Sequence, residues 1–193
     1  MLKLIRRSTA LRTRDLGRYG IPRWALRTLV ISGRAHRVGR GLYVANGTAA
    51  TEVQSYVEAM KVVSHGVICL LSALRMHGMT TQAPFEVWVA VDVKARKPKA
   101  DHPPMRFARF SGKALIEGVE VHRIRGTDVR VYSPAKTIAD CFKYRNKIGI
   151  DVALEALRDG LRQRKATRDD IHRMAKLCRV SNVIRPYMES LAL

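Results

Sequence analysis

Apolar residues between positions 22 and 32 recur at the spacing of an amphipathic α-helix. At about 100° per residue, Leu26, Leu29 and Val30 fall on one face of such a helix. The opposite face carries Trp24, Arg27 and Thr28, with Arg23 beside them. The pattern predicts a helix that packs through its apolar side and leaves the other side free.

A shorter helix is predicted just before it, over residues 14–19. Thr13 is a suitable N-cap because its hydroxyl can accept a backbone N–H of the first turn. Gly20 ends this helix, since glycine readily takes the positive φ found just past a helix C-terminus. Pro22 suits the start of the next helix, where its missing N–H costs nothing. Two helices joined by so short a turn are typical of a helix-turn-helix.

A two-stranded hairpin is predicted to follow, with strands at residues 35–38 and 42–44. Gly39 and Gly41 permit the positive φ angles of a tight turn and place Arg40 at its tip. The residues 1–48 are therefore expected to form a winged helix-turn-helix, a DNA-binding domain, with an ordinary surface hairpin as the alternative.

A winged helix-turn-helix places its second helix in the major groove, where arginine reads guanine and threonine contacts phosphate or a thymine methyl. The wing places arginines near phosphate or the minor groove. A solvated basic face is the alternative for the helix, and Trp24 could instead pack against the hairpin. The predicted DNA contacts are Arg23, Trp24, Arg27 and Thr28 from the helix, and Arg37 and Arg40 from the wing.

The remainder of the chain, residues 49–193, is predicted to be an α+β domain with a small sheet of about four strands and a C-terminal helical bundle. The strand-like runs are residues 85–91, 105–110, 119–124 and 129–132. The helical runs are residues 51–63, 65–77, 134–142, 150–164, 168–178 and 180–191.

Charge indicates a polyanionic partner. The chain carries 36 Lys and Arg against 16 Asp and Glu, which gives a net charge of +20. Residues 1–50 contain eleven of these basic residues and a single acid, Asp15. Because arginine suits bidentate phosphate and base contacts, double-stranded DNA is the expected partner. No apolar run approaches the ~20 residues that a membrane span needs, and no secretion signal is evident, so the cytoplasm is the expected location.

The cysteines and histidines do not suggest a metal or cofactor site. Cys69, Cys141 and Cys178 are far apart in the sequence and lie among apolar residues, so they are expected to be buried free thiols. None lies at zinc-site spacing from a histidine. We expect no metal, no cofactor and no enzymatic activity.

Four stretches resemble signatures of the AbiEi family, the antitoxins of abortive-infection AbiE systems. They are residues 20–23 (GIPR), 38–43 (VGRGLY), 72–80 (SALRMHGMT) and 132–157, which begins YSPAKTIADCF. The resemblance implies an autorepressor that binds inverted repeats in its own promoter through the winged helix. It also implies that the C-terminal domain counteracts a nucleotidyltransferase-like toxin in a type IV toxin–antitoxin system, in which the two proteins need not form a stable complex.

The last of these stretches supplies a predicted antitoxin surface. Its polar and charged candidates are Lys136, Asp140, Lys143, Arg145, Asn146 and Lys147. The same stretch could instead consist largely of core and capping residues.

Two other functions are compatible with the sequence. Asp92 and Lys94 follow a predicted strand as in the Asp-x-Lys half of a restriction-type, metal-dependent nuclease, although the only nearby acid, Glu86, belongs to the same strand. The C-terminal domain could also be a pure interaction module that binds the toxin or a second copy of the chain.

Overall fold

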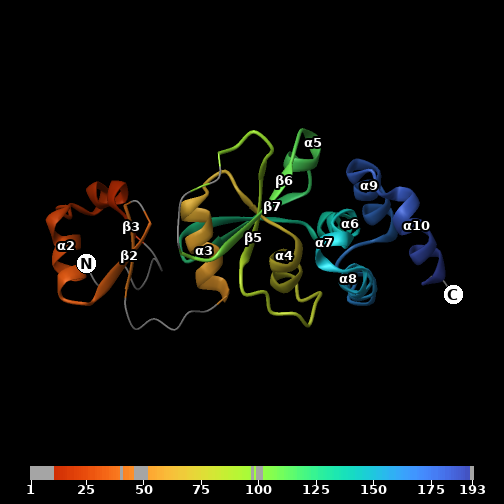
Figure 1. The fold of residues 1–193 in the computed structure, drawn as a ribbon, viewed down its shortest axis with the longest axis horizontal. Coiled ribbons are helices and arrows are strands. Elements are labelled where there is room, and N and C mark those ends of the chain that lie inside the picture. The colour runs from red at the N-terminus through yellow and green to blue at the C-terminus, as the bar shows by residue number, and fades with distance from the viewer. Residues whose placement is uncertain (1–10, 40, 46–51, 97, 99–101, 192–193) are drawn as a thin grey trace.

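The computed structural model describes residues 11–39, 41–45, 52–96, 98 and 102–191. In these ranges the protein is mixed α+β, with two small sheets and a set of C-terminal helices. The molecule is elongated: the N-terminal unit lies at one end, the larger sheet in the middle and the last helices at the other end (Figure 1). No helix in the described ranges is both long and apolar enough to cross a membrane.

The N-terminal unit is a three-stranded antiparallel sheet with two short helices. Strand β3 lies at the centre and pairs with β1 and β2. Its elements are β1 (Leu11–Arg12), the 3-10 helix η1 (Thr13–Tyr19), α2 (Trp24–Ile31), β2 (Ala35–Gly39) and β3 (Leu42–Ala45). The predicted helix pair and hairpin are thus present, but the first helix is a 3-10 helix. The predicted domain boundary at residue 48 lies outside the described residues.

Thr13 does not cap this helix as predicted. Its hydroxyl donates instead to the backbone carbonyl of Gly41, at 3.0 Å, and its N–H donates to the same oxygen at 2.8 Å. Gly41 has a φ of +70°, and a Cβ there would lie 2.4 Å from the Thr13 hydroxyl oxygen. The Thr13 hydroxyl, which the local sequence predicts to cap the helix, is therefore used in a tertiary hydrogen bond to the hairpin.

The larger sheet has five strands in the order β6-β5-β4-β8-β7, one more strand than predicted. Strand β4 pairs antiparallel with β5 and parallel with β8. The strands are β4 (Val67–Ile68), β5 (Val87–Asp92), β6 (Met105–Phe110), β7 (Val119–Ile124) and β8 (Thr127–Tyr132).

The extra strand corrects the helix predicted over residues 65–77. Only Leu70–Met76 is helical, as α4, while Val67–Ile68 is β4 at the centre of the sheet. Ile68 lies between Val89 of β5 and Val131 of β8, and these pairings are long-range. An all-apolar run suits a buried strand as well as a buried helix, so periodicity alone could not separate the two.

Helices cover both faces of this sheet. Side chains alternate along β5, so Val89 packs toward α3 (Glu52–Val62) while Trp88 and Ala90 pack toward α4 and the C-terminal helices. The C-terminal helices are α6 (Pro134–Lys143), α7 (Arg145–Ile148), α8 (Ile150–Arg162), α9 (Arg168–Cys178) and α10 (Ser181–Ser190), and the short α5 (Lys113–Ile116) precedes β7. Figure 1 shows α3 and α6 on opposite sides of the strands.

Two helix starts follow the sequence signals. Ser133 caps α6 by accepting the N–H of Lys136, with Pro134 in the first turn. Thr167 and Asp170 form a capping box at α9, in which each side chain satisfies the backbone N–H of the other. These local interactions confirm the predicted starts of both helices.

Candidate nucleic-acid interface

The turn between η1 and α2 is built as the sequence indicates. Gly20 has a φ of +60°, and the N–H of Ile21 donates to the carbonyl of Leu16 at 3.1 Å. Helix α2 begins at Trp24, two residues later than predicted, and Arg23 precedes its first turn. The short turn fixes the direction in which α2 leaves the small core.

Only part of the predicted apolar stripe of α2 is buried. Leu26 is buried and Leu29 packs partly against the same core, but 37% of Val30 is exposed. Val30 lies at the edge of the stripe, 40° past Leu26 and 100° from Leu29 on a helical wheel. Among the described residues, the buried core of the unit is formed by Leu11, Leu16, Leu26, Ala35 and Ala45.

The opposite face of α2 is solvent-exposed. Trp24 and Ile31 are 69% and 75% exposed, and Arg27 and Thr28 between them are exposed as well. The positions i, i+3, i+4 and i+7 lie on one side of an α-helix, so these four side chains form a single stripe, named here the α2 stripe. The exposure of Trp24 removes the alternative in which it packs against the hairpin.

Ile31 was not among the predicted contact residues, although its spacing from Trp24 could have identified it. The hydroxyl of Thr28 donates to the carbonyl of Trp24 at 3.3 Å, so its donor is used within the helix. Thr28 therefore offers its methyl group and an acceptor to a ligand, rather than a free donor.

The other predicted DNA contacts are only partly placed. Arg23 is exposed at the start of α2, and Arg37 is exposed on β2 opposite Tyr43 of β3. The strand register shifts between Arg37 and Gly39, which is a bulge near the hairpin tip. Arg40 lies outside the described residues.

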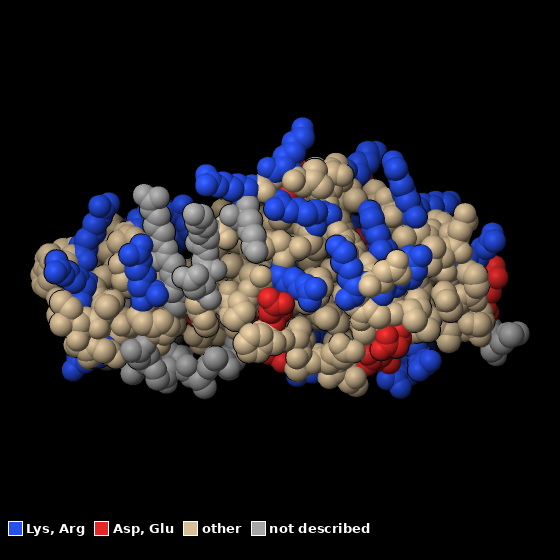
Figure 2. All heavy atoms as spheres, viewed as in Figure 1, with Lys and Arg blue, Asp and Glu red and all other residues tan. Residues whose placement is uncertain are grey.

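Positive charge dominates this unit. Between residues 11 and 45, outside position 40, seven arginines face a single acid, Asp15. The nearest Arg14 and Asp15 atoms are 4.0 Å apart, a weak surface pair. Lysine and arginine side chains also spread over the rest of the face shown in Figure 2, where carboxylates are sparse.

Of the six residues predicted to form an antitoxin surface, four lie at the surface and two are buried, so the prediction is wrong for those two. Lys136 and Asp140 have 0% side-chain exposure, and the Lys136 Nζ lies 2.5 Å from an Asp140 carboxylate oxygen. The Lys136 ammonium also lies over the rings of Tyr132 and Phe110, 4.1 and 4.8 Å from their centroids. These two residues belong to the packing between α6 and the sheet, because α6 turns this face inward.

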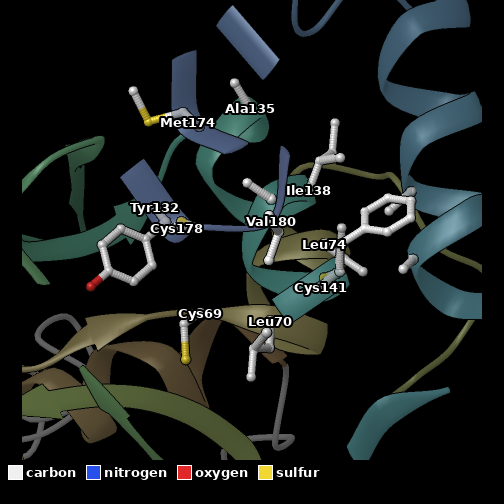
Figure 3. Close-up of a cluster of buried hydrophobic side chains, with 14 of the residues drawn as sticks. Cys69, Leu70, Leu74, Tyr132, Ala135, Ile138, Cys141, Met174, Cys178 and Val180 are labelled. Carbon is white, nitrogen blue, oxygen red and sulfur yellow. The ribbon is translucent and has the colours of Figure 1, made fainter. Parts of the chain in front are cut away.

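The surroundings of this ion pair are a thiol-containing hydrophobic core. The thiol of Cys178 donates to Asp140 at 3.2 Å, and Figure 3 shows Tyr132, Cys178 and Cys141 within the same cluster. Burial raises the pKa of Asp140, which the Lys136 charge opposes, and burial raises the pKa of Cys178 to about 12. All three cysteines are buried free thiols, as predicted, and their raised pKa values keep them protonated and unreactive.

The other four predicted residues lie at the surface near α7. Lys143, Asn146 and Lys147 are exposed. Arg145 is half-buried and donates to the carbonyl of Phe142 at 2.9 Å. Helix α7 lies beyond the central sheet from the N-terminal unit (Figure 1), so this surface is separate from the α2 stripe.

The nuclease residues are not brought together. Glu86 precedes β5 and Asp92 ends it, about 20 Å apart at the rise of a strand. An Asp92 carboxylate oxygen accepts the N–H of Lys94 at 2.8 Å, which is a local turn interaction. Among the described residues, no three His, Cys, Asp or Glu side chains are grouped so as to hold a metal ion.

No protein-family model and no curated protein matches this chain.

Proposed function

We propose that this protein is a DNA-binding transcriptional repressor whose N-terminal unit acts as a winged helix-turn-helix. The observation that carries the proposal is the α2 stripe: four exposed side chains on one helix face, in a unit with seven arginines and one acid between residues 11 and 45, outside position 40. A helix with one buried and one exposed arginine-bearing face is what major-groove recognition requires.

The dimensions of the α2 stripe suit a major groove. Helix α2 has eight residues and is therefore about 12 Å long, and its two end residues are separated by about 10 Å. At 3.4 Å per base pair that distance spans about three base pairs. Arg27, at the centre, would read guanine, while Trp24 and Ile31 would contact thymine methyl groups on either side.

The resemblance to AbiEi antitoxins extends this proposal to autorepression and toxin neutralisation. Two copies of the unit would bind inverted repeats in the promoter of the protein's own gene, with Arg37 and Arg40 of the wing on the backbone. The second domain would counteract a nucleotidyltransferase-like toxin, and its exposed candidates are now Lys143, Arg145, Asn146 and Lys147.

DNA binding is tested by fluorescence anisotropy with a labelled duplex from that promoter. Arg27→Ala should weaken binding roughly 5- to 150-fold, the loss of about 1–3 kcal/mol for a base-reading arginine. The matched control is Arg158→Ala, which removes an exposed arginine from α8 at the other end of the molecule. Equal affinity of the two variants would refute the placement of the DNA-binding face.

Toxin neutralisation is tested separately by growth of cells that express the toxin encoded beside this gene. Arg27→Ala should still rescue growth, because α2 lies outside the second domain. The double variant Lys143→Ala/Lys147→Ala should still repress but rescue less well. Loss of rescue in Arg27→Ala, or loss of repression in the double variant, would contradict the assignment of DNA binding and toxin neutralisation to separate domains.

A further inference from the structure

A groove of about 320 Å³ lies between the N-terminal unit and the larger domain. Three segments that are distant in sequence meet there: η1, the end of α3 and the turn between β7 and β8. The lining includes Asp15, Arg18, Tyr19, Lys61, Arg125 and Asp128. Its volume is within the range of small-molecule sites, which is about 300–1,000 Å³.

Packing between β3 and α3 holds the N-terminal unit against the larger domain beside the groove. Leu42 and Val44 of β3 are buried and pack against Val62, the last residue of α3. Tyr43, between them, contributes to the core of the N-terminal unit. Strand β3 thus contacts its own unit through one face and α3 through the other, and this contact brings η1 close to Lys61.

The lining is rich in cations that come from all three segments. Arg18, Arg123 and Arg125 are exposed, and Lys61 is half-buried. Burial lowers the pKa of Lys61 to about 8, and the Arg12 charge adds to this effect while the carboxylates of Asp15 and Glu58 oppose it. The four cations outnumber the two carboxylates of the lining, Asp15 and Asp128, so the groove has a net positive charge that attracts anions.

Two further features indicate what kind of anion would fit. Tyr19 is half-exposed and offers a ring for stacking. The carboxylates of Asp15 and Asp128 also line the groove, and Asp128 accepts from Arg123 at 2.5 Å. Carboxylates repel a continuous phosphate backbone, whereas they can accept hydrogen bonds from sugar hydroxyls or a base amino group. The lining therefore suits a compact ligand with phosphates at one end and a polar aromatic group at the other.

We propose that this groove binds a nucleoside di- or triphosphate. Arg18, Lys61 and Arg125 hold the phosphates, and Tyr19 stacks against the base. The ligand contacts both the N-terminal unit and the larger domain, so its binding holds the two parts together. This site is separate from the α2 stripe, and nucleotide binding does not require DNA.

The test is isothermal titration calorimetry of the full-length protein with ATP, GTP and inorganic tripolyphosphate, in the absence of DNA. The variant Arg18→Gln/Arg125→Gln should bind all three at least about tenfold more weakly, because charge-assisted contacts are lost. The matched control, Arg158→Gln/Lys176→Gln, removes two exposed cations from α8 and α9 at the far end of the molecule and should bind as the wild type does. Circular dichroism verifies that each variant is folded.

A third variant separates the two parts of the ligand. Tyr19→Leu should weaken ATP and GTP binding but leave tripolyphosphate binding unchanged, because only the nucleotides have a base to stack. The proposal is overturned if the wild type binds none of the three ligands at about 1 mM, or if both double variants lose affinity equally. It is also overturned if the groove variant weakens only DNA binding, which would make the groove a backbone contact.

Discussion

Removing one partner of the buried Lys136–Asp140 pair should destabilise the protein strongly, whereas replacing both should not. Both side chains are fully buried, and Asp140 holds Lys136 at 2.5 Å while it accepts from the Cys178 thiol at 3.2 Å. Asp140→Ala removes the carboxylate partner of the buried Lys136 ammonium and leaves it over the rings of Tyr132 and Phe110. The expected cost is about 3–5 kcal/mol, the usual range for breaking a buried pair.

The assay is urea unfolding followed by circular dichroism, supported by thermal melting. For a domain of this size 1 kcal/mol corresponds to about 2–4 °C, so the melting temperature should fall by about 6–20 °C. The double variant Lys136→Met/Asp140→Leu should stay within about 1.5 kcal/mol of the wild type, because it buries no charge and keeps a similar volume.

An exposed pair of the same spacing provides the control. Arg185 and Glu189 are also four residues apart on one helix, 3.9 Å from each other and largely exposed. Glu189→Ala should therefore cost less than about 0.5 kcal/mol. If Asp140→Ala were as stable as Glu189→Ala and yet lost toxin neutralisation, the interpretation of Lys136 and Asp140 as core residues would be refuted.

Three further predictions concern the N-terminal unit and a helix cap. Gly41→Ala should destabilise the N-terminal unit by about 1–3 kcal/mol, because of its φ of +70° and the 2.4 Å approach to the Thr13 hydroxyl. Thr13→Ala should relieve part of that cost in a double-mutant cycle of urea unfolding, and additive effects would contradict the proposed clash. Ile31→Ala should weaken operator binding in the anisotropy assay without lowering stability, since Ile31 is exposed; unchanged binding would remove it from the interface. Hydrogen bonding from Thr167 lowers the pKa of Asp170 in the folded protein. The ionised Asp170 should therefore stabilise the fold above the unfolded-state pKa near 3.9, and this stabilisation should be lost as the pH falls through the lower folded-state pKa. Asp170→Asn should therefore be less stable than the wild type at pH 7 and equal to it in strong acid, and a gap that persists there would contradict this assignment.

The sequence predicts well those elements whose signals are local. Ser133-Pro134 and the Thr167–Asp170 box mark helix starts that the structure confirms, because a cap depends on residues three positions apart. Gly20 and Gly41 likewise mark turns that need a positive φ, whereas Gly39, for which the sequence predicts the same, is the last residue of β2. On α2, helical spacing correctly places Trp24, Arg27 and Thr28 on the exposed side. It would have added Ile31 had the stripe been continued one turn further.

Tertiary structure decides what depends on partners distant in the chain. Val67–Ile68 becomes a central strand because β5 and β8 lie on either side of it, which no local pattern reveals. Lys136 and Asp140 are polar in sequence but buried, because α6 packs this face against the sheet and the two charges offset each other there. The cationic groove likewise forms only because β3 packs against α3 and brings η1 beside the β7–β8 turn. Sequence periodicity determines which residues share one face of a helix or strand. Whether that face is buried depends on the elements that the rest of the chain packs against it.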